Sequence, residues 1–366
     1  MSDALEVLRV AVAHGLPGAP HSVDAPPTLT TGVIALAEQH RVQGLLWEAI
    51  EAGAVIGDDD VVAAARESLL AALRTCLLAE ETAALACGAL SFAGVDVRVL
   101  KGVAIAHLDH ADPAERVFGD ADLLVRRADY KAALAALVAA GFVRAEPPVR
   151  GWWEQRFGKA IVLYAPSGGE LDLHLAITGG YFGERIEHER LWSASGAPFT
   201  LACATVSGLS AEGRLLHACC HAVLGGGSGL RAKRDVAQLV LVSGADWPSV
   251  VADAVVDGVE LAVAEAVRAT WSELNLDMAH GLAVWASGDS AHSVQATALA
   301  GYRNATRQGW AQEGRTTVTA LGVLDRVRYA TGLAWPSSAS LSFRNRTRWQ
   351  HMRVTVGRYF VTSGGG

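Results

Sequence analysis

Two aspartates that stand two residues apart at the start of an apolar run are the feature that most limits how this chain can fold. The segment 119–125 reads Gly-Asp-Ala-Asp-Leu-Leu-Val, and its apolar part predicts a buried strand over 121–125. Side chains at positions i and i+2 lie on one face of a strand, so Asp120 and Asp122 should point the same way. With a rise of about 3.3 Å per residue, their Cα atoms should lie about 6 to 7 Å apart. That spacing allows two carboxylates to bind one cation or a metal pair.

A third aspartate lies in a second strand pattern. The segment 170–174 reads Glu-Leu-Asp-Leu-His, and alternation places Glu170, Asp172 and His174 on one face. If this strand lies beside the first, at about 4.8 Å, three carboxylates meet. They would repel one another and raise each other's pKa values, unless a divalent cation offsets their charge. Oxygen ligands of this kind suit Mg²⁺, so the sequence predicts a magnesium site in which Glu170 is only a solvated strand end.

The spacing of apolar residues along the sequence divides the chain into three parts. Helical spacing prevails in a predicted N-terminal region at 1–95, with helices over 3–14 and 32–52 and from residue 62. Between 96 and 205 the patterns are mixed, with strands over 96–100, 121–125, 161–164 and 170–177 and helices over 101–108 and 129–140. A predicted C-terminal region at 206–366 is helical again, over 211–224, 231–243, 258–276, 290–303 and 316–331. The prediction is an α+β fold, in which a small mixed sheet in a catalytic core is flanked by helical regions.

Composition and charge limit the classes of partner that the chain can be expected to bind. Apolar residues make up 51% of the chain and charged residues 19%, which is a globular composition. Acidic residues outnumber basic ones by 38 to 31, so a nucleic-acid partner is disfavoured. No stretch reaches the roughly 18 apolar residues of a membrane span, and the N-terminus lacks a signal-peptide pattern. The five cysteines show no CxxC spacing and predict free thiols in a cytoplasmic protein. These patterns do not indicate an oligomeric state.

Three blocks around the aspartates carry a family resemblance. They are Leu-Lys-Gly at 100–102, Arg116 followed by the strand at 120–125, and Leu-Asp-Leu-His at 171–174. Together they resemble a poorly characterised bacterial nucleotidyltransferase family within the DNA polymerase beta superfamily, over roughly residues 95–245. Superfamily members place a glycine-serine or glycine-glycine pair on a helix before the D-x-D strand. Here Lys101-Gly102 stands at that place, and the serine is absent.

The resemblance implies a reaction and a set of roles. An acceptor would attack the α-phosphorus of an NTP in line, and pyrophosphate would leave. Asp120 and Asp122 would be shared Mg²⁺ ligands, while Asp172 would bind the catalytic metal and take the acceptor's proton. Backbone amides at a helix start and nearby cations suit triphosphate oxygens. The residues expected to contact the phosphates are Lys101, Gly102 and Arg116.

Several other residues admit two interpretations each. His174 is either a partner of the metal ligands or a packed, hydrogen-bonded histidine. His217 and His221 are four apart on a helix, as in a zinc pair, but no third ligand is near, so a structural or substrate-facing role is favoured. Trp152 and Trp153 either form a lid that stacks on a base or an acceptor ring, or pack against the helical region. Packing is the favoured alternative.

Three function classes remain open from the sequence. The first is an enzyme that transfers a nucleoside monophosphate to a small molecule, peptide or protein. The second is a toxin-like transferase that modifies RNA, supported only by the C-terminal arginines at 344, 346, 348, 353 and 358. The third is a catalytically silent module that holds a nucleotide. Metal-dependent NTP turnover separates the first two from the third, and a tRNA labelling assay separates the second from the first.

Overall fold

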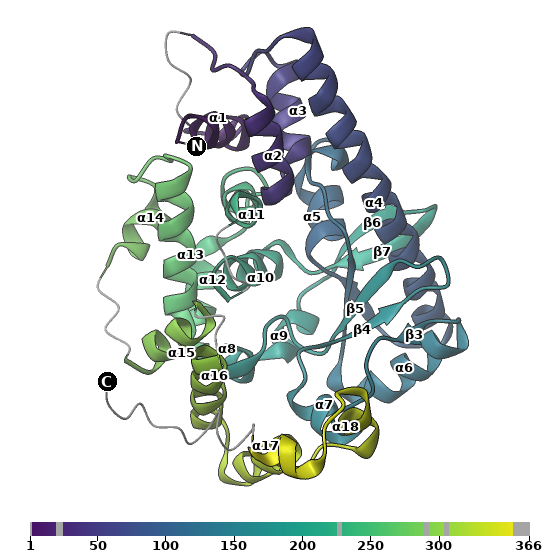
Figure 1. Cartoon of the computed structure of the whole chain (residues 1–366). Coiled ribbons are helices and arrows are strands. Elements are labelled where there is room, and N and C mark those ends of the chain that lie inside the picture. The colour runs from purple at the N-terminus through teal and green to yellow at the C-terminus, as the bar shows by residue number, and fades with distance from the viewer. Residues whose placement is uncertain (1, 20–24, 225–228, 289–292, 304–306, 354–366) are drawn as a thin grey trace.

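A seven-stranded mixed sheet organises the middle of the chain in the computed structural model (Figure 1). The model describes residues 2–19, 25–224, 229–288, 293–303 and 307–353. The strand order is β3-β4-β5-β2-β1-β7-β6. The strands are β1 (Val97–Val99), β2 (Ala121–Val125), β3 (Val143–Arg144), β4 (Ala160–Tyr164), β5 (Glu170–His174), β6 (Ala197–Leu201) and β7 (Ala204–Gly208). The predicted α+β class, with a mixed sheet between helical ends, is confirmed.

The register of the central strands determines which side chains meet. Strands β2 and β5 are parallel neighbours, as the three-carboxylate prediction required, and Asp122 lies directly opposite Asp172. Leu124 lies opposite His174 in the same ladder. Strand β4 runs antiparallel to β5 and places Val162 opposite Asp172. All five residues of β2 are buried, because this apolar strand lies at the centre of the sheet with neighbours on both edges.

Four helices precede the sheet: α1 (Ser2–Ala13), α2 (Thr31–His40), α3 (Gln43–Glu51) and α4 (Asp59–Phe92). The single helix predicted over 32–52 is wrong, because Arg41 takes a left-handed backbone conformation with φ 52° that ends α2. The long α4 packs against β2, β5 and the helix α6 (Tyr130–Ala139). The apolar spacing predicts a buried helical face at Ala65, Leu69, Leu73 and Leu77; Ala65 and Leu69 are buried, but Leu77 is 65% exposed, so the expectation is wrong there.

Shorter helices connect the strands, and a helical array follows them. Between strands lie α5 (Lys101–Asp109), α6, α7 (Gly151–Phe157), α8 (Gly180–Arg185) and α9 (His188–Ser193). After β7 come α10 (Ala211–Leu224), α11 (Leu230–Leu241), α12 (Trp247–Asp257), α13 (Glu260–Glu273), α14 (Gly281–Ala286), α15 (Ser293–Arg303), α16 (Arg307–Ala320), α17 (Val323–Ala334) and α18 (Ser338–Phe343). The predicted helix over 316–331 is instead the end of α16 and most of α17, which are separated near Gly322.

Two apolar cores hold these elements together. One core lies between the sheet, α4, α5 and α6. The other joins α1, α2 and α3 to the helices that follow β7, chiefly α10, α11 and α13. Figure 1 shows the last helices, α17 and α18, beside α7 at the end of the molecule away from α1. None of the helices in the described ranges combines the length and the apolar character needed to cross a membrane.

Candidate active site

Asp122, Asp172 and His174 bring their side chains together on one face of β2 and β5. Each offers one ligand atom, and the three atoms lie within 4.8 Å of one another. His174 is fully buried, and its Nε2 lies 2.7 Å from Asp122 Oδ1 and 3.9 Å from Asp172 Oδ2. An ionised carboxylate can only accept a hydrogen bond, so the imidazole donates from Nε2 to Asp122. The predicted convergence of strand residues is therefore present for these three side chains.

Lys101 completes this cluster from the start of α5. Its Nζ lies 2.5 Å from Asp122 Oδ1 and 3.4 Å from His174 Nε2. Its backbone is left-handed, with φ 41°, a strained conformation for a residue with a long side chain. Burial alone would raise the pKa of Asp122, but the ammonium of Lys101 and the hydrogen bond from His174 hold that pKa below its usual range. Asp122 is therefore ionised and ready to bind a cation.

The pKa of Asp172 is shifted in the opposite direction to that of Asp122. Burial, followed by the negative charges of Asp122 and Asp120, raises the pKa of Asp172 to about 6. Its side chain keeps 23% of its surface exposed, so it faces the open side of the cluster. Burial and the nearby charge of Lys101 lower the pKa of His174 to about 4, so this ring is neutral near pH 7. Two carboxylates that repel each other offer oxygen ligands that fit a divalent cation, and the hydrogen bond from His174 orients one of them, Asp122.

The other residues selected from the sequence lie around this cluster. Asp120 lies in the bend before β2, outside the group of converging ligand atoms, and borders a separate hollow of about 380 Å³. Gly102 is buried, and a Cβ atom there would lie 2.5 Å from Phe118 Cβ. This contact explains the missing serine, because no side chain fits at position 102 without moving Phe118.

The side chain of Arg116 is already paired with other groups of the protein. Its guanidinium is buried and makes a bidentate ion pair with Asp235 on α11, with N–O distances of 2.8 and 2.7 Å. A third hydrogen bond goes to the carbonyl of Val117. Each edge of this cation therefore already has an acceptor. The phosphate contacts expected of Lys101, Gly102 and Arg116 stay predictions.

Helix α10 carries two histidines, His217 and His221, and the first of them packs beside the acid cluster. The ring of His217 lies 6.4 Å from the ring of His174, and burial lowers the pKa of His217 well below its usual value. Within the described residues, His217 and His221 do not belong to a group of three converging metal ligands. His217 is buried, whereas His221 lines a cavity of about 620 Å³, so the structural or substrate-facing role favoured from the sequence stays a prediction. The ring contact with His174 could not be read from the sequence, because it joins β5 to α10.

The two tryptophans of α7 have different environments. The Trp153 ring packs against Phe157 and Tyr329, with centroid distances of 5.8 and 5.5 Å. Its Nε1 donates to the carbonyl of Tyr329 on α17. Trp152 is 43% exposed. Packing against the helical region, the favoured interpretation, is what the structure shows for Trp153.

The C-terminal arginines are placed in part. Arg344 lies 3.4 Å from Glu146, and the guanidinium of Arg348 lies over the ring of Trp335. Arg358 lies outside the described residues. Arg344 therefore has a carboxylate within ion-pair distance, and Arg348 has an aromatic neighbour.

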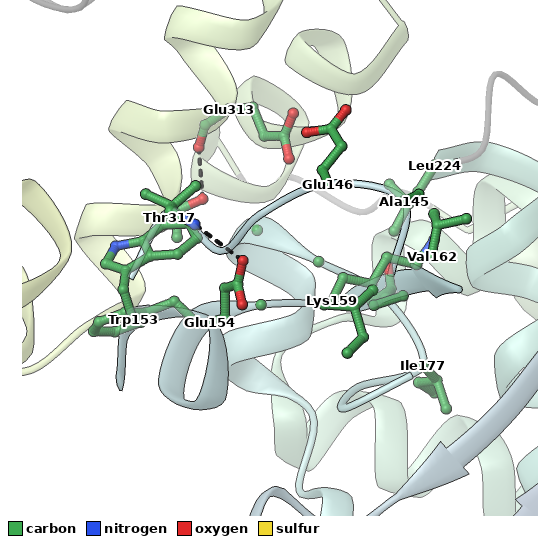
Figure 2. Close-up of a pocket in the computed structure, with 18 of the residues that line it drawn as sticks. Ala145, Glu146, Trp153, Glu154, Lys159, Val162, Ile177, Leu224, Glu313 and Thr317 are labelled. Carbon is green, nitrogen blue, oxygen red and sulfur yellow. Dashed lines mark hydrogen bonds between the residues drawn. The ribbon is translucent and has the colours of Figure 1, made fainter. Parts of the chain in front are cut away.

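A cavity of about 620 Å³ opens beside the cluster, between β4, α7, α8, α10, α16 and α17 (Figure 2). Val162 and Glu170 line it, and these residues flank Asp172 on the same face of the sheet. Lys159, which the sequence analysis missed, also lines the cavity. Burial and the charge of Lys101 lower the pKa of Lys159, while Asp122 and Asp172 act in the other direction. Asp122, Asp172 and His174 are not among the residues that line this cavity, but their sheet neighbours Val162 and Glu170 are.

Comparison with known proteins agrees with this geometry. The model of a family described as uncharacterised nucleotidyltransferase matches residues 28–271, which is more than half of the chain and includes the whole acid cluster. No curated protein and no solved structure matches the chain. The matched range ends in α13, so α14 to α18 lie beyond it. On the strength of the family match, the chain belongs to the uncharacterised nucleotidyltransferase family.

Proposed function

We propose that the protein is a magnesium-dependent nucleotidyltransferase that moves a nucleoside monophosphate from an NTP to an acceptor hydroxyl and releases pyrophosphate. The observation that carries the proposal is the placement of Asp122 opposite Asp172 in adjacent parallel strands, with His174 beside both. Strand pairing fixes these positions, so the ligand atoms converge without a flexible loop. Asp120, which lies outside this converging group but whose charge raises the pKa of Asp172, is proposed as the third carboxylate of the magnesium site.

Each acid has a distinct part in the proposed reaction. Lys101 and His174 keep Asp122 ionised, so it is a permanent ligand rather than a base. Asp172, whose pKa without metal is raised while that of Asp122 is lowered, would bind the catalytic metal and accept the proton of the attacking hydroxyl. A bound Mg²⁺ would offset the repulsion of the carboxylates and screen the charge of the phosphates. Proton removal from the acceptor and in-line attack on the α-phosphorus then give the product and pyrophosphate.

The acceptor would reach the acids from the large cavity. Its volume, about 620 Å³, is in the range of small-molecule sites, roughly 300 to 1,000 Å³. Figure 2 shows the carboxylates of Glu146 and Glu313 pointing toward each other at one side of it, with Trp153 on the wall. Hydrogen-bonding and aromatic groups thus share the lining. This mixture supports a small molecule or a peptide side chain as acceptor.

The test is nucleotide transfer by the purified protein. We expect pyrophosphate release with at least one labelled NTP and Mg²⁺ in the presence of a metabolite and peptide extract, and its loss after addition of EDTA. Asp122→Asn should abolish transfer and leave the circular-dichroism spectrum unchanged, because a ligand is lost without a change of shape. Asp60→Asn, at an exposed aspartate of α4, is the matched control. Transfer within a few-fold of wild type in Asp122→Asn at saturating Mg²⁺ would contradict the proposal.

A further inference from the structure

The cations selected from the sequence are already neutralised within the protein. Lys101 pairs with Asp122, and Arg116 makes a bidentate pair with Asp235. A triphosphate carries several negative charges and binds best to guanidinium or ammonium groups that are not engaged elsewhere. A site for an NTP therefore calls for further positive charge near the acids.

Arg41 supplies one such charge. The backbone of Arg41 is left-handed and ends α2. Its guanidinium lies close to Gly119, the residue before Asp120, because a Cβ atom added to Gly119 would lie 3.5 Å from Arg41 Nη1. Arg41 and Asp120 border the same hollow of about 380 Å³, together with Thr75 of α4 and the acidic residues Glu38 and Glu170. Among the described residues that line this hollow, Arg41 is the basic one. Across the described ranges, no carboxylate lies within 4.0 Å of Arg41 in an ion pair. Arg41 thus places a solvent-accessible guanidinium beside the segment 120–122, which contains Asp120 and Asp122.

Arg231 supplies a second charge, from the first turn of α11. It is half-buried and lies one helical turn before Asp235, the residue of α11 that pairs with Arg116. Burial, and then the positive charges of Arg116 and Arg41, lower its pKa to about 10. Asp235 and Asp120 favour its charged form from the same region, but no described carboxylate reaches ion-pair distance. A cation that is partly removed from water beside two other cations is unfavourable. A bound anion would offset this repulsion.

We propose that Arg41 and Arg231 bind the triphosphate of the NTP on the Asp120 side of the acid cluster. This inference rests on the proposed function and deepens it, because it assigns the two sides of the cluster to different substrates. The acceptor then uses the large cavity on the Asp172 side. Each guanidinium offers five N–H donors in a planar fork that matches phosphate oxygens. Arg41 directly follows α2 and Arg231 belongs to α11, so the triphosphate would connect two distant parts of the family-matched range.

The test is binding of each NTP with Mg²⁺, and of inorganic tripolyphosphate, measured by calorimetry. Arg41→Met and Arg231→Met keep much of the aliphatic side chain and remove the charge. We expect each variant to raise the Kd about 10-fold or more, as for the loss of one charge-assisted contact. The double variant should show a larger loss than either single one. Arg66→Met, at an exposed arginine of α4, should leave the Kd unchanged.

Thermal unfolding separates a binding role from a structural one. Arg231→Met removes a cation that faces Arg116 and Arg41, so its melting temperature without ligand should equal or exceed that of wild type. A lower melting temperature together with an unchanged Kd would assign Arg231 to the fold and overturn the inference. An unchanged Kd in both arginine variants, with tight binding by wild type, overturns the inference and leaves the proposed function standing. Wild-type protein that binds neither an NTP nor tripolyphosphate overturns both.

Discussion

Replacement of Asp172 by asparagine should stabilise the metal-free protein, and the gain should depend on pH. The pKa of this carboxyl rises from 3.8 to about 6 on folding. At 1.36 kcal/mol per pKa unit, ionised Asp172 destabilises the fold by up to about 3 kcal/mol. The folded state binds the proton more tightly than the unfolded state, so wild-type stability falls as the pH rises from about 4 to about 6. Asparagine keeps the shape and removes the charge.

Urea unfolding in EDTA, followed at several pH values, measures this difference. Below pH 4 both forms of the residue are uncharged, and Asp172→Asn should match wild type within about 0.5 kcal/mol. Above pH 6.5 the variant should be more stable by about 1 to 3 kcal/mol, the upper value being the full charge effect. A variant that is less stable than wild type at pH 8 would refute the reasoning, because Asp172 would then be a structural partner and not a repelled ligand.

Two further substitutions test the surroundings of the acids. Gly102→Ser should lower stability by about 1 to 3 kcal/mol, since the new Cβ would lie 2.5 Å from Phe118; urea unfolding measures this, and Phe118→Ala in the same chain should recover part of the loss. Lys101→Ala removes the charge that lowers the pKa of His174, which is now about 4. Burial is the main cause of that low pKa and Lys101 the next, so NMR titration of His174 should then give a higher pKa, and an unchanged value would mean that Lys101 has no part in setting it.

The strands that carry the acids could be predicted because their pattern is local. Period-two alternation placed Asp172 and His174 on one face, and an uninterrupted apolar run located β2. That Asp122 faces Asp172 also depends on strand pairing and register, which the sequence analysis could only assume. The contact between Lys101 and Asp122 depends on the left-handed backbone at residue 101, which no residue pattern indicates for a lysine.

The hairpin of β6 and β7 shows why other elements escaped prediction. Its two-residue turn consists of Ala202 and Cys203, with φ values of 45° and 67°. Two left-handed residues form the turn that suits a tight hairpin, but the usual signal for it is Asn-Gly or Asp-Gly. The flanking strands are largely exposed on one face and short. Tertiary context therefore imposes a backbone conformation that these residues do not favour by themselves.

The arginines of the further inference were missed for another reason. Arg41 and Arg231 are 190 positions apart, and neither lies in a recognisable motif. Only the packed structure places Arg41 at the hollow that Asp120 borders, and Arg231 one helical turn from Asp235, the partner of Arg116. A list of charged residues cannot separate neutralised cations from those left for a ligand. That distinction depends on partners brought together by folding.

The walls of the large cavity come from two stretches of chain, one inside the family-matched range and one beyond it. Lys159 and Thr178 lie inside that range, whereas Tyr302, Glu313 and Tyr329 lie beyond it. If the acceptor occupies this cavity, the C-terminal helices help to select the acceptor, while the acids of the family-matched range carry out nucleotide transfer. A chimaera that joins residues 1–271 of this chain to the C-terminal segment of a relative should keep the donor nucleotide and change the molecule that receives it.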